Sequence, residues 1–411
     1  MKKRVISFFL VIALAFGLCA CASNGGSSQS DEAVLAQRRD AAEAYMRKMC
    51  SILWRADGDF QYSLRSDSTD VAEDVQKYPD KVITVKAGQL YRGPLYTHGI
   101  GNLDTYLDYT TGEENGIYTL SADVAVSMNG GRETARIGNS CSGAVEMAWG
   151  QVATSFLPEK TANLTPNNGY LRVGEYKADP AVNNETKKVC EENGTQTMYA
   201  AYAQLQKADA VVHFDNGTGH VMLISSVTVV KDEEGKISGR DSKVTTIHQT
   251  NGKIQDREIY FDETLQETVH LIAGIDDEFT FSQLFTRGYL PITCKEFVDP
   301  APLPEAKVTD SETTYTKDNI FAGTFTCPYM MMSVTVTVTD KDGNTVQEVT
   351  CYAQREMFKS FPLETFTTED PRVLLGSLDL TTLTAGEYHC THVCRLVTGE
   401  EITVRDFDFT V

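Results

Sequence analysis

The chain lacks several signatures that would indicate a function directly. It has no phosphate-binding Walker loop, no dinucleotide-binding glycine fingerprint, no CxxC pair and no convincing internal repeat. Positive charge is also scarce, because 37 Lys and Arg residues stand against 57 Asp and Glu residues, for a net charge of −20. A chain this acidic repels nucleic acids and anionic lipid surfaces, so we expect no nucleic-acid partner.

Apolar runs long enough to span a bilayer are missing as well. After the basic start "MKKR", the 14-residue stretch "VISFFLVIALAFGL" is too short for a spanning helix and typical of a signal peptide. Its end, "LCAC", resembles the bacterial lipobox, which implies lipid attachment at Cys21; an ordinary cleavage site is the alternative. We expect residues 1–21 to be the leader and residues 22–31 a flexible tether. The protein would then be extracytoplasmic, anchored to a bacterial membrane and facing the cell wall.

Eight cysteines lie outside the leader, at irregular spacings that fix no disulfide pairing. In "CTHVC", Cys390 and Cys394 lie four residues apart in an expected strand, with His389 and His392 nearby, so a zinc site can be considered. That spacing places both cysteines on one face of the strand. A position in the core or in a disulfide is the favoured interpretation.

The length of 411 residues suggests two or three domains. Residues 32–56 are rich in alanine and contain no glycine or proline, which predicts one helix within an N-terminal helix and extension, residues 32–90. In residues 91–298, an expected helix after Cys141 is followed by the β-branched runs "DAVVHF", "HVMLISSVTVV" and "SKVTTIHQT". A helix followed by antiparallel strands predicts the α+β class.

Residues 299–306, "DPAPLPEA", contain three prolines and predict a stiff linker. In residues 307–411, "SVTVTVTD" alternates strictly and "DKDGN" supplies a hairpin turn, which predicts an all-β sandwich. "GEYHC" resembles the tyrosine corner of immunoglobulin-like domains, with Tyr388 two residues before Cys390. No tryptophan follows Cys327, which argues against an immunoglobulin disulfide.

Cys141, in "RIGNSCSGAVEMAWGQV", stands at the start of a predicted helix rather than within its apolar stripe. Asn139 or Ser140 can cap this helix, which leaves Cys141 in the first turn. Unpaired N–H groups and the helix dipole favour a thiolate there, and Gly143 would let a substrate backbone come close. A structural cysteine at a helix start would look similar.

A thiolate nucleophile needs a base and a group that orients the base. His220 lies at the start of an expected strand after a tight turn, and His248 lies on a following strand. A hairpin between these strands could place both imidazoles on one face. Gln249 is the alternative third member. Taken alone, each histidine is more simply explained as a surface or core residue.

In order along the chain, "NSCSGAV", "KADAVVHF", "GHVMLI" and "TTIHQ" resemble the motifs of the NlpC-type cell-wall peptidases, which are papain-like cysteine peptidases. The resemblance covers roughly residues 91–275. It implies a papain-like domain with Cys141 as nucleophile, His220 as base and His248 as orienting residue. In "YRGPLYTHG", it matches Tyr96 to a tyrosine near the oxyanion site.

Ser142 and Gly143 follow the nucleophile in this motif and are expected at the oxyanion or substrate site. Ser140 replaces the aspartate that usually precedes the nucleophile, and 44 residues separate Tyr96 from Cys141, more than is usual. The intervening insert could wall or cover the cleft.

Other candidate sites have simpler explanations. His213, Asp215 and His220 in "HFDNGTGH" could form a metal loop, but a turn between strands explains the pattern more simply. The acidic clusters "TGEEN", "DEEG" and "IDDE" are interpreted as solvated turns. We expect no metal ion and no cofactor.

The sequence therefore predicts a lipid-anchored cysteine peptidase or amidase that hydrolyses amide bonds in peptidoglycan stem peptides or cross-bridges. Two alternatives remain open. An acyltransferase could use the same residues. A non-catalytic surface-binding lipoprotein could use the same scaffold, with Cys141 unreactive or in a disulfide with Cys190.

Overall fold

The computed structural model describes residues 30–65, 71–97, 99–123, 138–154, 161–166, 170–178, 185–250, 259–368 and 373–411. The expected leader with Cys21, nearly all of the tether and residues 124–137 of the insert lie outside these residues. Over the described part of the chain, every helix is too short or too polar to cross a membrane.

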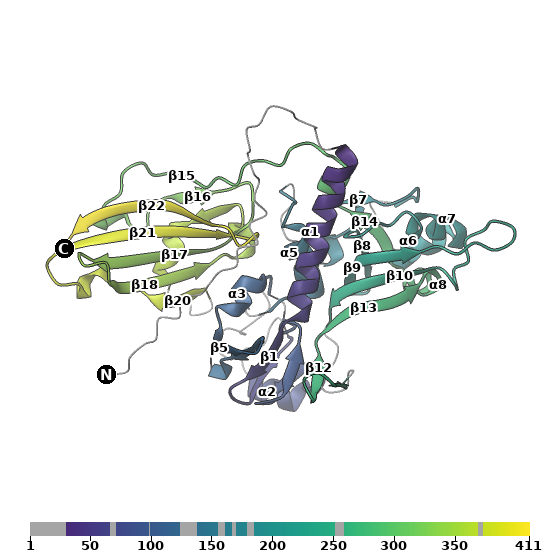
Figure 1. Ribbon diagram of the computed structural model, residues 1–411, viewed down its shortest axis with the longest axis horizontal. Coiled ribbons are helices and arrows are strands. Elements are labelled where there is room, and N and C mark those ends of the chain that lie inside the picture. Colours follow the sequence, from purple (N-terminus) through teal and green to yellow (C-terminus); the bar gives the residue numbers. More distant parts are fainter. Residues whose placement is uncertain are drawn as a thin grey trace.

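The described residues form a mixed α+β structure with two hydrophobic cores. Its central sheet has six antiparallel strands in the order β13-β10-β9-β8-β14-β7. Helices α1 and α5 pack against β9 and β10 (Figure 1). The strands are β7 Leu171–Arg172, β8 Ala210–Asp215, β9 Thr218–Thr228, β10 Lys243–Gln249, β13 Ala273–Thr280 and β14 Leu290–Thr293.

A second sheet of six strands has the order β11-β12-β4-β1-β6-β5, and β2 and β3 pair separately. It joins strands from the N-terminal extension, the insert and the segment after β10. The strands are β1 Leu53–Ala56, β2 Phe60–Ser63, β3 Val82–Val85, β4 Leu90–Arg92, β5 Thr110–Glu114, β6 Ile117–Leu120, β11 Ile259–Asp262 and β12 Glu267–Leu271.

The helices are mostly short and surround these sheets. The α-helices are α1 Asp31–Ser51, α2 Val71–Lys77, α3 Leu103–Leu107, α5 Cys141–Trp149, α6 Thr186–Asn193, α7 Thr195–Tyr202 and α8 Phe281–Arg287. The 3-10 turns are η1 Pro79–Lys81, η2 Thr161–Asn163, η5 Lys295–Phe297, η6 Lys317–Asn319, η7 Arg355–Met357, η8 Leu363–Thr367 and η9 Leu380–Thr382.

The prediction of one helix over 32–56 is wrong at its end, because α1 stops at Ser51 and the next residues form β1. Trp54 explains the change: its ring stacks on Tyr91 at 4.6 Å, and its indole donates a hydrogen bond to the Gly93 carbonyl. Pairing with β4 and β6 outweighs the helical propensity of this segment. Residues 31–92 thus share one core with the expected 91–298 domain, and a boundary at residue 90 does not separate two cores.

The C-terminal residues form a five-stranded sheet, β20-β18-β17-β21-β22, and a three-stranded sheet, β15-β16-β19. The alternating "SVTVTVTD" lies in β17, with its valines buried, and pairs with β18 through the "DKDGN" turn, as predicted. The strands are β15 Thr309–Asp310, β16 Thr324–Thr326, β17 Met331–Asp340, β18 Thr345–Tyr352, β19 Ser360–Pro362, β20 Leu374–Ser377, β21 Glu387–Leu396 and β22 Glu401–Thr410.

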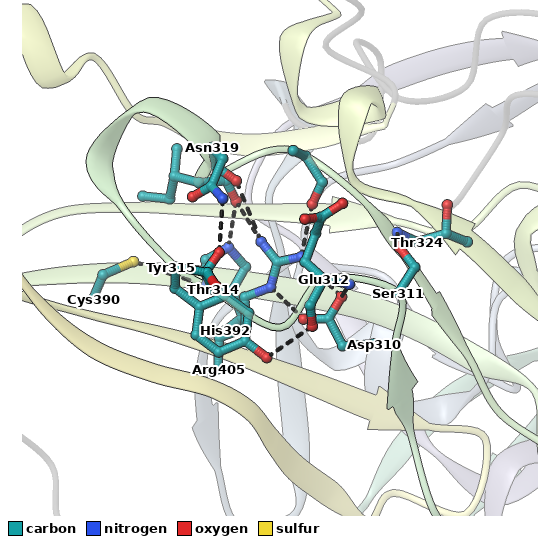
Figure 2. Close-up of polar contacts among 12 residues, drawn as sticks. Asp310, Ser311, Glu312, Thr314, Tyr315, Asn319, Thr324, Cys390, His392 and Arg405 are labelled. Atoms are coloured by element: carbon teal, nitrogen blue, oxygen red, sulfur yellow. Dashed lines mark hydrogen bonds and ion pairs between the residues drawn. The ribbon is translucent and has the colours of Figure 1, made fainter.

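A buried guanidinium ties the loop before β16 to the five-stranded sheet (Figure 2). Arg405 on β22 is 1% exposed and forms two hydrogen bonds to Asp310, at 2.7 and 3.0 Å. It also donates to the Ile320 and Ala322 carbonyls, while His392 contacts the Ile320 carbonyl at 2.9 Å. These bonds satisfy a charge that burial would otherwise disfavour strongly. The cluster stabilises the fold of this domain.

The two parts of the molecule pack directly against each other beyond the linker 299–306. Arg395 on β21 forms an ion pair with Asp108 of the insert, and the Tyr352 hydroxyl donates to the same carboxylate at 2.8 Å. Arg38 on α1 donates to the carbonyls of Asp299 and Ala301, which fixes the start of the linker. The proline-rich segment therefore connects parts that also share a polar interface.

Candidate functional site

Cys141 is the first residue of α5, and Ser140 caps this helix. The Ser140 side chain accepts a hydrogen bond from the Gly143 N–H at 3.2 Å. Cys141 is 3% exposed, and all nine residues of α5 are buried, so the helix is enclosed on every side rather than on one face. The thiol therefore lies in the first turn of a buried helix.

A short backbone bridge brings Tyr96 beside Cys141 despite the long insert between them. The Thr97 N–H donates to the Asn139 carbonyl, and the Asn139 N–H donates to the Leu95 carbonyl, both at 3.1 Å. Gly138 has a φ of +81°, and a side chain there would overlap the Leu95 carbonyl. The bridge therefore depends on a glycine three residues before the cysteine.

The Tyr96 hydroxyl lies 4.0 Å from the Cys141 sulfur, on a side chain that is 8% exposed. Burial raises the pKa of this hydroxyl well above its usual value, and the neighbouring Cys141 thiol raises it further. The hydroxyl therefore keeps its proton at neutral pH. It can donate a hydrogen bond to negative charge that develops next to the sulfur.

Two histidines and an aspartate form a chain of hydrogen bonds across three strands. His220 Nε2 on β9 lies 2.9 Å from His248 Nδ1 on β10. His248 Nε2 in turn lies 2.9 Å from Asp277 Oδ2 on β13. His248 is 4% exposed, whereas the Asp277 side chain is 41% exposed. The sequence therefore placed both histidines correctly on one face, but it missed the carboxylate.

A β-bulge turns Asp277 toward His248. In the β10–β13 ladder, Thr246 pairs with Asp277 and Ile247 pairs with Ile275, so Asp276 is an extra residue with a φ of +60°. The bulge shifts the alternation by one and places Asp277 on the face of His248. Interpreting "IDDE" as a solvated turn is therefore wrong, because these residues belong to β13.

Arg47 on α1 forms hydrogen bonds to the extra residue of the bulge. Its guanidinium forms hydrogen bonds to both Asp276 carboxylate oxygens at 2.9 Å and to Ser225 Oγ at 3.0 Å. Ser225 is skipped where β10 pairs with β9, so one arginine contacts the irregular residue on each side of β10. The N-terminal helix thus supports the strand that carries His248.

Gly274 allows His248 and Asp277 to approach each other. It lies opposite His248 in the ladder, and a Cβ at this position would overlap both His248 Nε2 and Asp277 Oδ2. Any larger residue would therefore push the carboxylate away from the imidazole.

Thr161, on the turn η2, connects the Cys141 sulfur to the strand that carries His220. Its hydroxyl lies 3.7 Å from the sulfur. Its methyl group lies against Gly219, the residue before His220, at 2.9 Å from the position of a Cβ there. Helix α5 also packs on β9. Cys141 and the strand that carries His220 therefore both contact Thr161, a residue with no sequence signal beyond an ordinary polar segment.

Three expected site residues have other contacts in the structure. A Cβ on Gly143 would meet the Gly99 carbonyl at 3.1 Å, so this glycine makes room for the chain's own backbone, not for a substrate. Gln249 is fully buried and donates to the Pro94 carbonyl at 2.5 Å, two residues before Tyr96. It anchors the tyrosine segment, whereas His248 is the residue that contacts His220. Ser142 is buried, and its hydroxyl lies 3.2 Å from that of Ser140.

No cluster of three or more His, Cys, Asp or Glu side chains in the described ranges is arranged to hold a metal ion. His213 Nε2 lies 3.2 Å from Asp215 Oδ2, and the two residues stand at the end of β8. Cys390 and Cys394 are buried core residues on one face of β21. The eight described cysteines are in the thiol form, so no Cys141–Cys190 disulfide is present among them.

Comparisons with protein-family models, curated proteins and solved structures found no match for this chain.

Proposed function

We propose that this protein is a cysteine peptidase or amidase in which Cys141 is the nucleophile and His220 the base. The observation that carries the proposal is the Asp277–His248–His220 chain of hydrogen bonds on the sheet against which α5, the helix that begins with Cys141, packs. A nucleophile, a base and a group that orients the base are the minimum for covalent catalysis by a thiol.

The chain of hydrogen bonds assigns a role to each nitrogen. An ionised Asp277 accepts the proton of His248 Nε2, which leaves His248 Nδ1 as an acceptor for the N–H of His220 Nε2. In this tautomer, Nδ1 is the basic nitrogen of His220. The second histidine and the carboxylate thus prepare His220 to take a proton and stabilise the imidazolium that forms.

The reaction follows in two halves. Cys141 gives its proton to His220 and attacks the carbonyl carbon, with the Cys141 N–H and the Tyr96 hydroxyl donating to the oxyanion. The imidazolium then protonates the leaving amine, and a thioester remains on the sulfur. Water, deprotonated by His220, attacks the thioester and releases the acid and the thiol.

The papain-like fold, the immunoglobulin-like character of the sandwich and the cell-wall substrate are parts of this proposal. The order of α5, β9 and β10 supports the first, and the sequence motifs around Cys141 and His220 support the resemblance to NlpC-type peptidases. The Tyr388 hydroxyl donates to the Thr384 carbonyl at 2.8 Å, which supports a tyrosine corner. Lipid attachment at Cys21 would hold the enzyme at the membrane, next to peptidoglycan.

The test uses the full-length chain in detergent, incubated with purified peptidoglycan stem peptides and analysed by mass spectrometry. Cys141→Ala should abolish cleavage, and Cys50→Ala, at another buried cysteine, should not. A product that carries an added amine would instead indicate an acyltransferase. Absence of cleavage, together with a Cys141 that a thiol reagent does not modify between pH 5 and 9, would contradict the proposal and favour a binding lipoprotein.

A further inference from the structure

The line of polar side chains formed by Asp277, His248 and His220 continues onto β8, toward the edge of the sheet at β7. His213 on β8 lies directly opposite His220 on β9, and such opposed residues place their side chains on the same face. The His213 ring lies 5.5 Å from the ring of Tyr289, the residue before β14. Burial raises the pKa of Tyr289 to about 12, although the nearby Arg287 guanidinium opposes this rise.

His213 and Tyr289 line an open cavity of about 610 Å³. Its opposite wall comes from α6 and the end of α8, which contribute Lys187, Lys188 and Arg287. The cavity therefore neighbours the candidate site through His213, which lines the cavity and pairs with His220 across β8 and β9. It is large enough for a few residues of a peptide.

The charges of the cavity are only partly paired within the protein. Lys188 lies 3.8 Å from Glu185, and His213 lies 3.2 Å from Asp215. Lys187 and Arg287 have no acidic group within 4.0 Å among the residues that the structure describes. One further carboxylate, Glu191, lines the cavity. The cavity lining carries as many carboxylates as Lys and Arg side chains, but Lys187 and Arg287 form no ion pair among the described residues.

We infer that this cavity is a substrate subsite in which Lys187 and Arg287 bind a carboxylate of the peptide. A guanidinium can hold a carboxylate through two parallel hydrogen bonds, and an ammonium adds a point charge. The inference rests on the proposed peptidase function and specifies its substrate class: peptides that carry a free carboxylate near the scissile amide.

The experiment measures binding without chemistry, so that it does not depend on cleavage. Full-length Cys141→Ala protein in detergent is titrated by calorimetry with two synthetic probes. The first is a stem tetrapeptide with free carboxylates, and the second is the same peptide with every carboxylate amidated. We expect the free acid to bind at least about tenfold more tightly.

The preference should disappear when Lys187→Gln and Arg287→Gln are combined in this background. The matched control combines Lys207→Gln and Lys243→Gln, which remove two positive charges at surface ion pairs outside this cavity. This control should keep the tenfold preference. Thermal melting of each variant verifies that it is folded.

The outcomes separate the two proposals. Equal affinity for both probes, or a preference that survives in the Lys187/Arg287 variant, overturns the subsite, even if the parent protein cleaves peptides. A preference that requires Lys187 and Arg287 supports the subsite, and if the parent does not cleave, only the peptidase function fails. If neither probe binds and nothing is cleaved, both proposals are overturned.

Discussion

The hydrogen bond between Asp277 and His248 can be broken by adding a single methyl group at Gly274. In Gly274→Ala, the new Cβ would overlap Asp277 Oδ2 and His248 Nε2. Gly274 does not have a left-handed φ, so alanine adds no backbone strain. His248 is buried, but the Asp277 side chain is 41% exposed and can swing into solvent. We therefore expect the hydrogen bond to be lost while the fold is retained.

The size of the effect follows from the bond that is lost. A hydrogen bond to a charged group contributes about 1.5–3 kcal/mol, which corresponds to a decrease in kcat/KM of about 10- to 150-fold. Gly112→Ala is the matched control, because a Cβ at Gly112 has no atom within 4 Å. It should leave the rate unchanged.

The assay compares hydrolysis rates of a stem peptide by the parent and by both alanine variants, with Asp277→Ala alongside. Because Gly274→Ala and Asp277→Ala remove the same interaction, their combination should cost little more than either change alone. A Gly274→Ala enzyme with a rate within twofold of Gly112→Ala would refute the reasoning. So would full additivity of the two changes.

Three further predictions concern the oxyanion donor and the sandwich. Tyr96→Phe should lower kcat about 100-fold or more with little change in KM, as measured by steady-state kinetics, if the hydroxyl stabilises the transition state next to Cys141. Tyr388→Phe should lower the unfolding free energy of the sandwich by about 1 kcal/mol in urea denaturation, because the Thr384 carbonyl loses its donor. Burial lowers the pKa of His392 to about 4, so the unfolded chain binds a proton below about pH 6.5 and the folded chain does not. Stability should therefore fall by up to about 3 kcal/mol as the pH drops from 6.5 to 4, and His392→Gln should flatten this dependence in pH-resolved thermal melts.

Local sequence patterns were sufficient to predict the positions of residues that depend only on the helix or strand in which they lie. The capping serine and the apolar run after Cys141 predict a helix start there, and the structure has it. The strands that carry His220 and His248 follow from β-branched runs joined by a hairpin. The alternating valines of β17 likewise predict one buried face.

Positions that depend on contacts between distant segments could not be predicted in this way. Asp277 reaches His248 only because Asp276 is an extra residue in its strand, and a bulge has no reliable signal in an acidic run. Gly143 accommodates the backbone at Gly99, which is brought there by the bridge at Asn139. Periodicity shows which face of an element is apolar, but not what will cover it.

The same reasoning explains why the sandwich and the candidate site belong to one structural unit. The start of α5 is fixed by the Leu95–Asn139 bridge, and its end contacts the sandwich. Gln151, two residues past the helix, donates to the Val397 carbonyl at 2.9 Å, and Met147 lies in the core of the sandwich. Contacts at both ends therefore fix the position of α5 and of Cys141, its first residue.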